Sequence, residues 1–279
     1  MGTFPERALA SLNAALTWLF DFLVAPAVRV APLTTLIVVS AVTGVGLLWV
    51  VGRTSNQAGI AAAKRGIQAG LFEIRLFNDN LAAVIRALGR VLGQNLRYLG
   101  YSLVPLAWVV LPLTLVVAQL QALYGYEGLA VGEPALVTLR VRDTRAAAGA
   151  TLVAQDGLAV DTAAVVLPGT SEIVWRLTPA APGDYMLTVR LGGTEVTKSL
   201  RVAGGAARRS PFRVSTLVDQ LLYPSEPPLP AYGPIAEIAL PYPEPGLSVL
   251  GWRVHWLIVY VLLSMAAAFS LARRLGVTL

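Results

Sequence analysis

The chain reads RTSNQAGIAAAKRGIQAGLFEIRLFNDNLAAVIRALGRVLGQNLR from Arg53 to Arg97, and this basic stretch decides the fold. It carries seven Lys and Arg residues against two carboxylates, and it lies between two uncharged runs, Val30–Gly52 and Tyr98–Tyr126. Each run is longer than the roughly 20 apolar residues that a membrane-spanning helix needs. Short loops rich in Lys and Arg remain in the cytoplasm. The pattern therefore predicts two membrane spans joined by a cytoplasmic segment.

A third run without Lys, Arg, Asp or Glu, Val254–Ala272, is followed by Arg273 and Arg274. Positive charge at this end indicates that the third span finishes in the cytoplasm. We expect a multi-pass protein of the cytoplasmic (inner) membrane. Its N-terminus and the long segment between the second and third spans would lie outside, and residues 53–97 and the C-terminus inside.

The composition agrees with a membrane protein. Of 279 residues, 56% are hydrophobic and 14% are charged, whereas about 25% of an ordinary soluble domain is charged. The net charge of +6 lies beside the apolar runs, so we expect anionic lipid headgroups as partners and no nucleic acid. Because the chain has no cysteine, disulfides and thiolate catalysis are excluded.

The predicted fold class is an α-helical membrane protein with three transmembrane helices and a cytoplasmic helical hairpin, plus a small all-β immunoglobulin-like sandwich outside the membrane. The predicted segments are an interfacial helix (1–29), transmembrane helix 1 (30–52), a basic amphipathic helical hairpin (53–97), transmembrane helix 2 (98–126), an extracytoplasmic β-sandwich (127–203), a Pro-rich tether with a short helix (204–251), and transmembrane helix 3 with a cytoplasmic tail (252–279). In the first segment, Trp18, Phe20 and Phe22 suit the headgroup region, and Pro26 is expected to end the helix. A re-entrant hairpin over residues 5–28 is the alternative.

The basic stretch contains a heptad pattern that predicts a coiled coil. Steps of four and three from Ile60 to Leu99 give a seam of twelve positions, nine of them apolar. The seam positions are Ile60, Lys64, Ile67, Leu71, Ile74, Asn78, Leu81, Ile85, Leu88, Leu92, Asn95 and Leu99. The Asn-Asp-Asn run at 78–80 favours a turn or a helix N-cap, so we expect two antiparallel arms. The alternative is that both arms lie flat on the inner leaflet, with Arg75, Arg86 and Arg90 near lipid phosphates.

Residue types within the spans predict packing and a bend. Pro105 and Pro112 each free a carbonyl of the second span, which indicates either helix packing or a concave surface. Gly44, Ser264 and Ala268 are small residues suited to close helix contact. The spans contain no charged residue, so proton relays and ion-coupled transport are disfavoured.

Alternating apolar and polar residues from 133 to 202 predict short half-buried strands, and hence an antiparallel sandwich. The Pro-Gly-Asp-Tyr run ending at Tyr185 resembles the late strands of immunoglobulin-like domains, in which such a tyrosine pins a corner through its hydroxyl. Prolines crowd residues 224–245 and favour an extended tether.

No catalytic, cofactor or metal site is predicted. The single histidine, His255, lies between two tryptophans at the start of the third span, where an interfacial role is expected. Asp156, Asp161 and Asp184 are candidate turn residues of the sandwich, without the spacing of a calcium loop. We therefore expect a protein that is not an enzyme.

The order of spans and the basic loop resemble the three-span members of the YidC/Oxa superfamily, over residues 30–126 and 252–274. That resemblance implies an insertase or membrane-protein chaperone, with a hydrophilic groove that guides client segments. The implied groove residues are Arg53 and Arg97 at its mouth and Thr43, Ser102 and Thr114 along it. The chain departs from the family through the inserted sandwich, the lack of an intramembrane arginine and the short tail.

A different function class fits the same sequence. The chain could be a non-catalytic accessory or scaffold subunit of a bacterial envelope or energy-transducing complex, binding other membrane proteins through its spans and periplasmic sandwich. A groove open to clients favours the insertase, whereas small-residue faces buried against partner subunits favour the scaffold.

Overall fold

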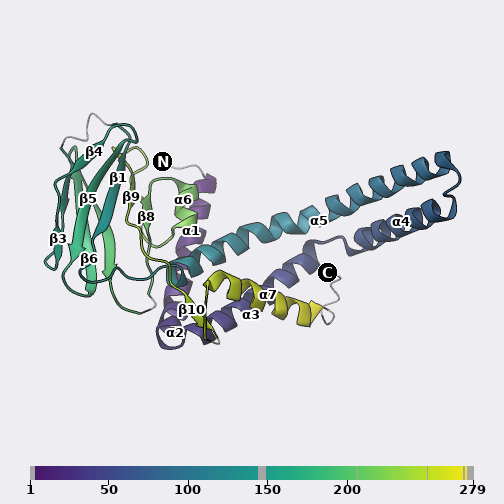
Figure 1. Cartoon of the computed structure of the whole chain (residues 1–279), viewed down its shortest axis with the longest axis horizontal. Coiled ribbons are helices and arrows are strands. Elements are labelled where there is room, and N and C mark those ends of the chain that lie inside the picture. Colours follow the sequence, from purple (N-terminus) through teal and green to yellow (C-terminus); the bar gives the residue numbers. More distant parts are fainter. Residues whose placement is uncertain (1–3, 144–148, 206, 250, 273, 275–279) are drawn as a thin grey trace. The chain divides into compact units, whose positions relative to one another are not determined.

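The computed structural model describes residues 4–143, 149–205, 207–249, 251–272 and 274 (Figure 1). Arg273, expected to follow the third span, and the tail 275–279 lie outside the described residues. The helices are α1 (Phe4–Leu19), the π-helical turn η1 (Phe20–Val24), α2 (Ala25–Val30), α3 (Pro32–Thr54), α4 (Gln57–Leu76), α5 (Leu81–Tyr124), α6 (Leu217–Leu222) and α7 (Trp256–Ala272). The chain forms two compact units, one of Met1–Leu36 with Thr114–Val259 and one of Ile37–Leu113 with Tyr260–Leu279.

Three helices of the described chain are long and apolar enough to cross a membrane: Ser11–Val30, Pro32–Thr54 and Leu81–Tyr124. Trp256–Ala272 is apolar but has only 17 residues. Together with a separate antiparallel β region, these helices confirm the predicted combination of long apolar helices and a β domain. The sequence prediction differs in counting the last helix and leaving out the first.

The helices α4 and α5 run side by side as an antiparallel hairpin (Figure 1). Asn56 caps α4 by accepting a hydrogen bond from the backbone N–H of Gly59 at 2.9 Å. Asn80 does the same for α5 through the N–H of Ala83 at 3.1 Å. These side chains satisfy N–H groups that a helix start leaves without partners, so the turn at 77–80 is set by its own sequence.

The seam of this hairpin corrects the predicted heptad. Ile60 is buried, and Ile67 and Ile74 are partly buried. The other apolar residues of the seam are exposed: Leu71, Leu81, Ile85, Leu88, Leu92 and Leu99. Small residues take the interface instead, and a Cβ on Gly70 would lie 2.5 Å from Cγ2 of Val91. Ala87, whose carbonyl oxygen would lie 3.5 Å from the same Cβ, is buried, as is Ala63 of α4. Because glycine and alanine allow a closer approach than leucine, the arms pack along their small-residue faces and leave the leucines outside.

In the same unit, α3 and α7 touch through small residues. A Cβ on Gly44 would lie 2.3 Å from the backbone oxygen of Ser264. Further along, Leu48 and Ala272 are buried together, with Ala268 packed against them. The predicted packing residues Gly44, Ser264 and Ala268 therefore all lie at one helix contact.

The β domain is a sandwich of two antiparallel sheets (Figure 1). Its strands are β1 (Ala135–Val141), β2 (Thr151–Val153), β3 (Leu158–Val160), β4 (Val165–Leu167), β5 (Glu172–Pro179), β6 (Gly183–Leu191), β7 (Thr194–Val202), β8 (Phe212–Val214) and β9 (Ile235–Ala239). One sheet has the order β3-β5-β1-β9-β8 with β4 on β5, and the other has β2-β6-β7. Alternate side chains from both sheets fill one core around Val137, Trp175 and Leu187.

The segment 204–251 differs from the expected tether. Its strand β9 pairs with β1, and Ile235 and Ile238 are buried in the sandwich core. The high proline content concealed this strand, because Pro234 and Pro241 flank it and none lies within it, so no ladder hydrogen bond is lost. A further hairpin of β10 (Leu247–Val249) and β11 (Trp252–Val254) leads to α7.

The N-terminal helix continues through Pro26, which lies in the first turn of α2 after the π-helical turn. One face is polar and bound to the sandwich unit. There Arg208 donates to Asp21 at 2.6 Å and to Gln119 at 2.8 Å, and Gln119 donates to Thr17 at 2.9 Å. The opposite face exposes large apolar side chains, namely Leu12, Trp18, Leu19, Phe22 and Leu23. The helix is therefore amphipathic.

Candidate functional site

A groove of about 260 Å³ lies where α3, α4 and α5 meet. Its walls are apolar side chains of all three helices, and its polar groups come from the start of α4 and the middle of α5. The lining residues are Val51, Ser55, Gln57, Ile60, Lys64, Tyr98, Ser102, Pro105, Leu106 and Val109. Pro105 lies within the continuous helix α5 and cannot donate a backbone hydrogen bond, so the carbonyl of Tyr101 loses its usual partner along this wall.

The polar side of the groove is organised around Lys64. Its ammonium lies 5.7 Å from the centroid of the Tyr98 ring, which is within the range of a cation–π interaction. The Ser102 hydroxyl donates to the carbonyl of Tyr98 at 2.9 Å. A positive charge, an aromatic face and a hydroxyl oxygen thus line one groove together with apolar side chains.

Of the residues predicted to form a groove, the structure places only Ser102 in this one. Arg53 lies 5.4 Å from the Trp49 ring centroid, and Arg97 is exposed on α5. Thr43 donates to the carbonyl of Val39 at 2.8 Å on the α3 face that meets Tyr260 of α7. Thr114 belongs to the other compact unit.

The sequence pattern did not identify Lys64 and Tyr98 as groove residues. Lys64 was assigned to the predicted hydrophobic seam, where a lysine is out of place. That irregularity was the available signal, because a polar residue at a seam position often has a specific local role. Tyr98 was counted as the first residue of a span, with no sign that it would face α4.

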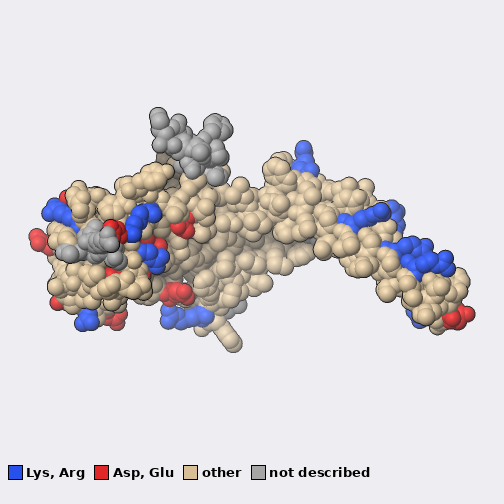
Figure 2. Space-filling view, turned by 90° about the horizontal axis from the view of Figure 1, so that it is seen from above, with Lys and Arg blue, Asp and Glu red and all other residues tan. Residues whose placement is uncertain are grey.

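Charge is spread unevenly along the hairpin. Figure 2 shows blue Lys and Arg side chains along this arm and red carboxylates close to its tip. Glu73 of α4 forms an ion pair with Arg90 of α5 on one side. Exposed leucines occupy another face of α5, namely Leu81, Leu88, Leu92, Leu96 and Leu99. The hairpin therefore presents an apolar stripe, which we define as these five leucines with Ile85, beside a basic face.

The sandwich unit contains a buried charged pair with a structural role. Lys198 is fully buried and donates to Glu226 at 3.0 Å and to the carbonyl of Ser210 at 2.7 Å. Glu226 also accepts the backbone N–H of Ser199 at 2.8 Å. Burial lowers the pKa of Lys198, and the charge of Glu226 opposes that shift. The pair fastens the segment after β8 to strand β7.

The described residues hold no group of three or more His, Cys, Asp or Glu side chains that could bind a metal ion. His255 accepts a hydrogen bond from the backbone N–H of Leu257 at 3.2 Å and its ring lies beside Trp256. Its Nδ1 therefore accepts a hydrogen bond from a backbone N–H in the first turn of α7. Asp161 accepts a hydrogen bond from Thr178 at 2.6 Å, within the sandwich.

No family model matches the chain, and no curated protein matches it.

Proposed function

We propose that this chain is a membrane-embedded protein that receives apolar client segments in the groove between α3, α4 and α5, as an insertase or membrane-protein chaperone of the YidC/Oxa type would. The observation that carries the proposal is the mixed lining of the groove. Lys64, Tyr98 and Ser102 bring donors and an aromatic face into apolar surroundings beside Pro105. It is proposed as a binding protein and not as an enzyme.

The chemistry of such a groove suits a segment entering a bilayer. Polar groups of the entering chain are costly to move from water into hydrocarbon unless they find hydrogen-bond partners. The ammonium of Lys64 and the hydroxyl groups supply partners, while Val51, Leu106 and the other apolar walls accept the client's side chains. A groove of this composition lowers the cost of entry without holding the segment permanently.

The apolar stripe on α5 supports the same function because it leads toward the groove. It continues past Leu99 to Leu103 and Leu106, which are also exposed, and Leu106 lines the groove. An amphipathic client segment could dock on this stripe before it reaches Lys64. The basic face beside the stripe would interact with anionic lipid headgroups.

The proposed placement follows the charge pattern, with the hairpin in the cytoplasm, the sandwich outside and the inner membrane between them. The exposed Trp18 and Phe22, stacked at 5.6 Å, support an interfacial N-terminal helix. The Tyr185 hydroxyl donates to the carbonyl of Ala181 at 3.0 Å, a corner contact that supports an immunoglobulin-like domain. Single cysteines at Gln68 and Gly192 should then react with impermeant reagents from opposite faces, and labelling of both from one face would refute this topology.

Site-specific photo-cross-linking tests the groove. Cross-linkers at Ser102 and Leu106 should capture nascent membrane segments, whereas one at Trp108, exposed on the same helix but outside the groove, should capture far less. Lys64→Gln should reduce capture at Ser102. Arg65→Gln removes the same charge one residue away, outside the groove, and should leave capture unchanged. Equal effects of these two substitutions would contradict the proposal.

A scaffold subunit remains the second candidate, and the exposed stripe is the observation that favours it, because a permanent partner helix would cover these leucines. Against it, the small-residue faces are used within this chain, at Gly44 with Ser264 and at Gly70 with Val91. If cross-linkers at Ser102 and Leu92 led to one stable, stoichiometric protein, the scaffold would replace the insertase.

A further inference from the structure

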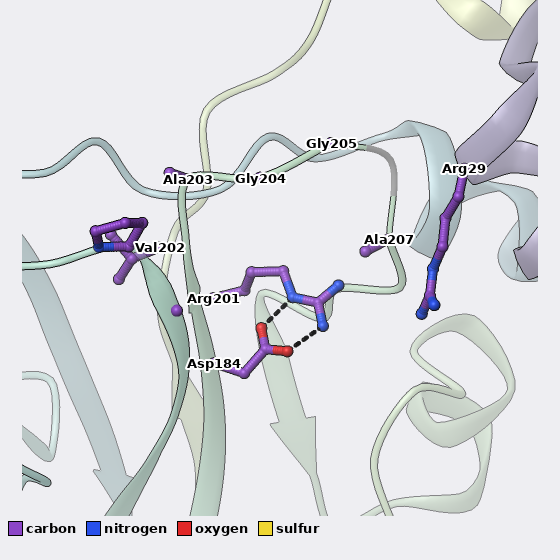
Figure 3. Close-up of a pocket in the computed structure, with 10 residues that line it drawn as sticks. Arg29, Asp184, Arg201, Val202, Ala203, Gly204, Gly205 and Ala207 are labelled. Carbon is purple, nitrogen blue, oxygen red and sulfur yellow. Dashed lines mark hydrogen bonds and ion pairs between the residues drawn. The ribbon is translucent and has the colours of Figure 1, made fainter.

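A cavity of about 540 Å³ lies within the sandwich unit, at the ends of strands β6 and β7 (Figure 3). Arg29 reaches it from the end of α2, and Asp184 and Arg201 reach it from the two strands. Ala203, Gly204, Gly205 and Ala207, which follow β7, line one side. The fold therefore brings Arg29 to the β6–β7 hairpin, which lies far from it in the sequence.

Positive charge exceeds negative charge in this cavity. Arg201 uses Nε and Nη2 to bind both oxygens of Asp184, which leaves its Nη1 for another partner. The Arg29 guanidinium lies across the cavity from this ion pair in Figure 3, and its charge acts on Asp184 without replacing Arg201 as the direct partner. Two arginines against one aspartate leave one positive charge without a counter-ion.

A second cavity of about 340 Å³ shares Asp184 and Arg201 with the first and adds Arg208 and Arg209 to its lining. Arg209 is almost fully buried and donates to the carbonyls of Tyr126, Gly204 and Gly205. Its Nε is buried and finds no acceptor among the described residues. An unsatisfied buried donor is costly, so an acceptor from a ligand would improve this site.

We propose that the Arg29–Arg201 cavity binds a phosphate-bearing group, and that the headgroup of an anionic phospholipid is its source. Guanidinium groups pair with phosphate through two parallel hydrogen bonds. The remaining wall is small and apolar, at Pro182, Val202 and Ala207, which suits the glycerol and first methylenes of a lipid better than a free ion.

The position of Arg29 supports a lipid. It is the second-last residue of the apolar helical stretch Ser11–Val30, and the same stretch exposes Trp18 and Phe22. Such aromatic residues prefer the headgroup level of a bilayer. A cavity of about 540 Å³ is also within the usual size range for small-molecule sites. The proposal does not depend on the α3–α4–α5 groove.

Calorimetric titration of the full chain in a neutral detergent tests this site with three probes. These are dihexanoyl-phosphatidylglycerol, inorganic phosphate, and dihexanoylglycerol, which lacks phosphate. We expect saturable binding of the phosphatidylglycerol, competition by phosphate and no binding of dihexanoylglycerol. Arg29→Gln should weaken binding about tenfold, the effect of one lost charge-assisted hydrogen bond. Because Arg29 is exposed and Asp184 keeps Arg201 as its direct partner, this variant should fold normally.

The matched control is Arg190→Gln, which removes one charge from β6 at the end away from the cavity, where Arg190 pairs with Glu195 at 2.9 Å. It should bind as the unmodified chain does. If phosphate alone bound as tightly as the lipid, the site would stand with a soluble phosphate as its ligand. Equal affinities of R29Q and the unmodified chain, or equal losses in R29Q and R190Q, would overturn the site. Client capture at Ser102 should be unchanged in R29Q, so the two proposals fail separately.

Discussion

The close contact of Gly70 with Val91 allows the hairpin to be tested by adding a single methyl group. In Gly70→Ala the new Cβ would lie 2.5 Å from Cγ2 of Val91, and a β-branched side chain has little freedom to move away. Gly89 provides the control, because a Cβ there meets nothing within 4 Å. Replacing glycine by alanine inside a helix stabilises the helix by about 1 kcal/mol. This gain is the same in G70A and G89A.

The difference between the two variants is the cost of overpacking, about 1–3 kcal/mol. Since each 1.4 kcal/mol is a factor of ten, the hairpin of G70A should open about 5 to 150 times more often than that of G89A. Hydrogen exchange of amides in α4, measured on the full chain in detergent, reports this local opening. Adding Val91→Ala removes the clashing atom and should restore much of the protection. Equal protection in G70A and G89A, or no recovery with V91A, would refute the small-residue interface.

Three further predictions follow from the described packing and charges. Leu71→Asp should be tolerated because Leu71 is 54% exposed, whereas Ala63→Asp buries a charge in the hairpin and should make it sensitive to limited proteolysis. Gly44→Leu should lower the melting temperature in detergent, because its Cβ would meet a backbone oxygen at 2.3 Å, while Gly46→Leu has open space and should not. The Arg201 guanidinium holds the pKa of the Asp184 carboxyl below its ordinary value, so the stabilisation is full above pH of about 4 and is lost as the pH falls through the lowered pKa. Asp184→Asn should therefore flatten the loss of melting temperature between neutral and strongly acid pH.

The sequence predicted helices, turns and strands well where they depend on residues that are adjacent in the chain. Asparagine before a helix caps its first turn, so Asn80 allowed the turn at 77–80 to be predicted from the sequence. The alternation around Val137 and Trp175 identified half-buried strands for the same reason. These features depend on neighbouring residues and on burial of one face, both of which are visible in a single sequence.

Features that depend on which helix or strand surfaces pack together could not be predicted from the sequence. The heptad of Leu71 and Ile85 is a correct description of an apolar face, but the arms pack through Gly70 and Ala87 instead. Hydrophobic periodicity cannot tell a buried stripe from one kept for a partner. The arginine-lined cavity was equally invisible, since Arg29 and Arg201 meet only through tertiary structure.

The polar bridge from Arg208 to the N-terminal helix has a consequence for biosynthesis. Asp21 and Arg208 are 187 positions apart in the chain. At ribosomal rates of about 5–20 residues per second, the aspartate waits roughly 10 to 40 s before its arginine is made. During that interval the polar face of the first helix can form hydrogen bonds only with water or with another protein. A factor that recognises emerging helices could bind this polar face during the interval. The opportunity would end when residue 208 leaves the ribosome and can pair with Asp21.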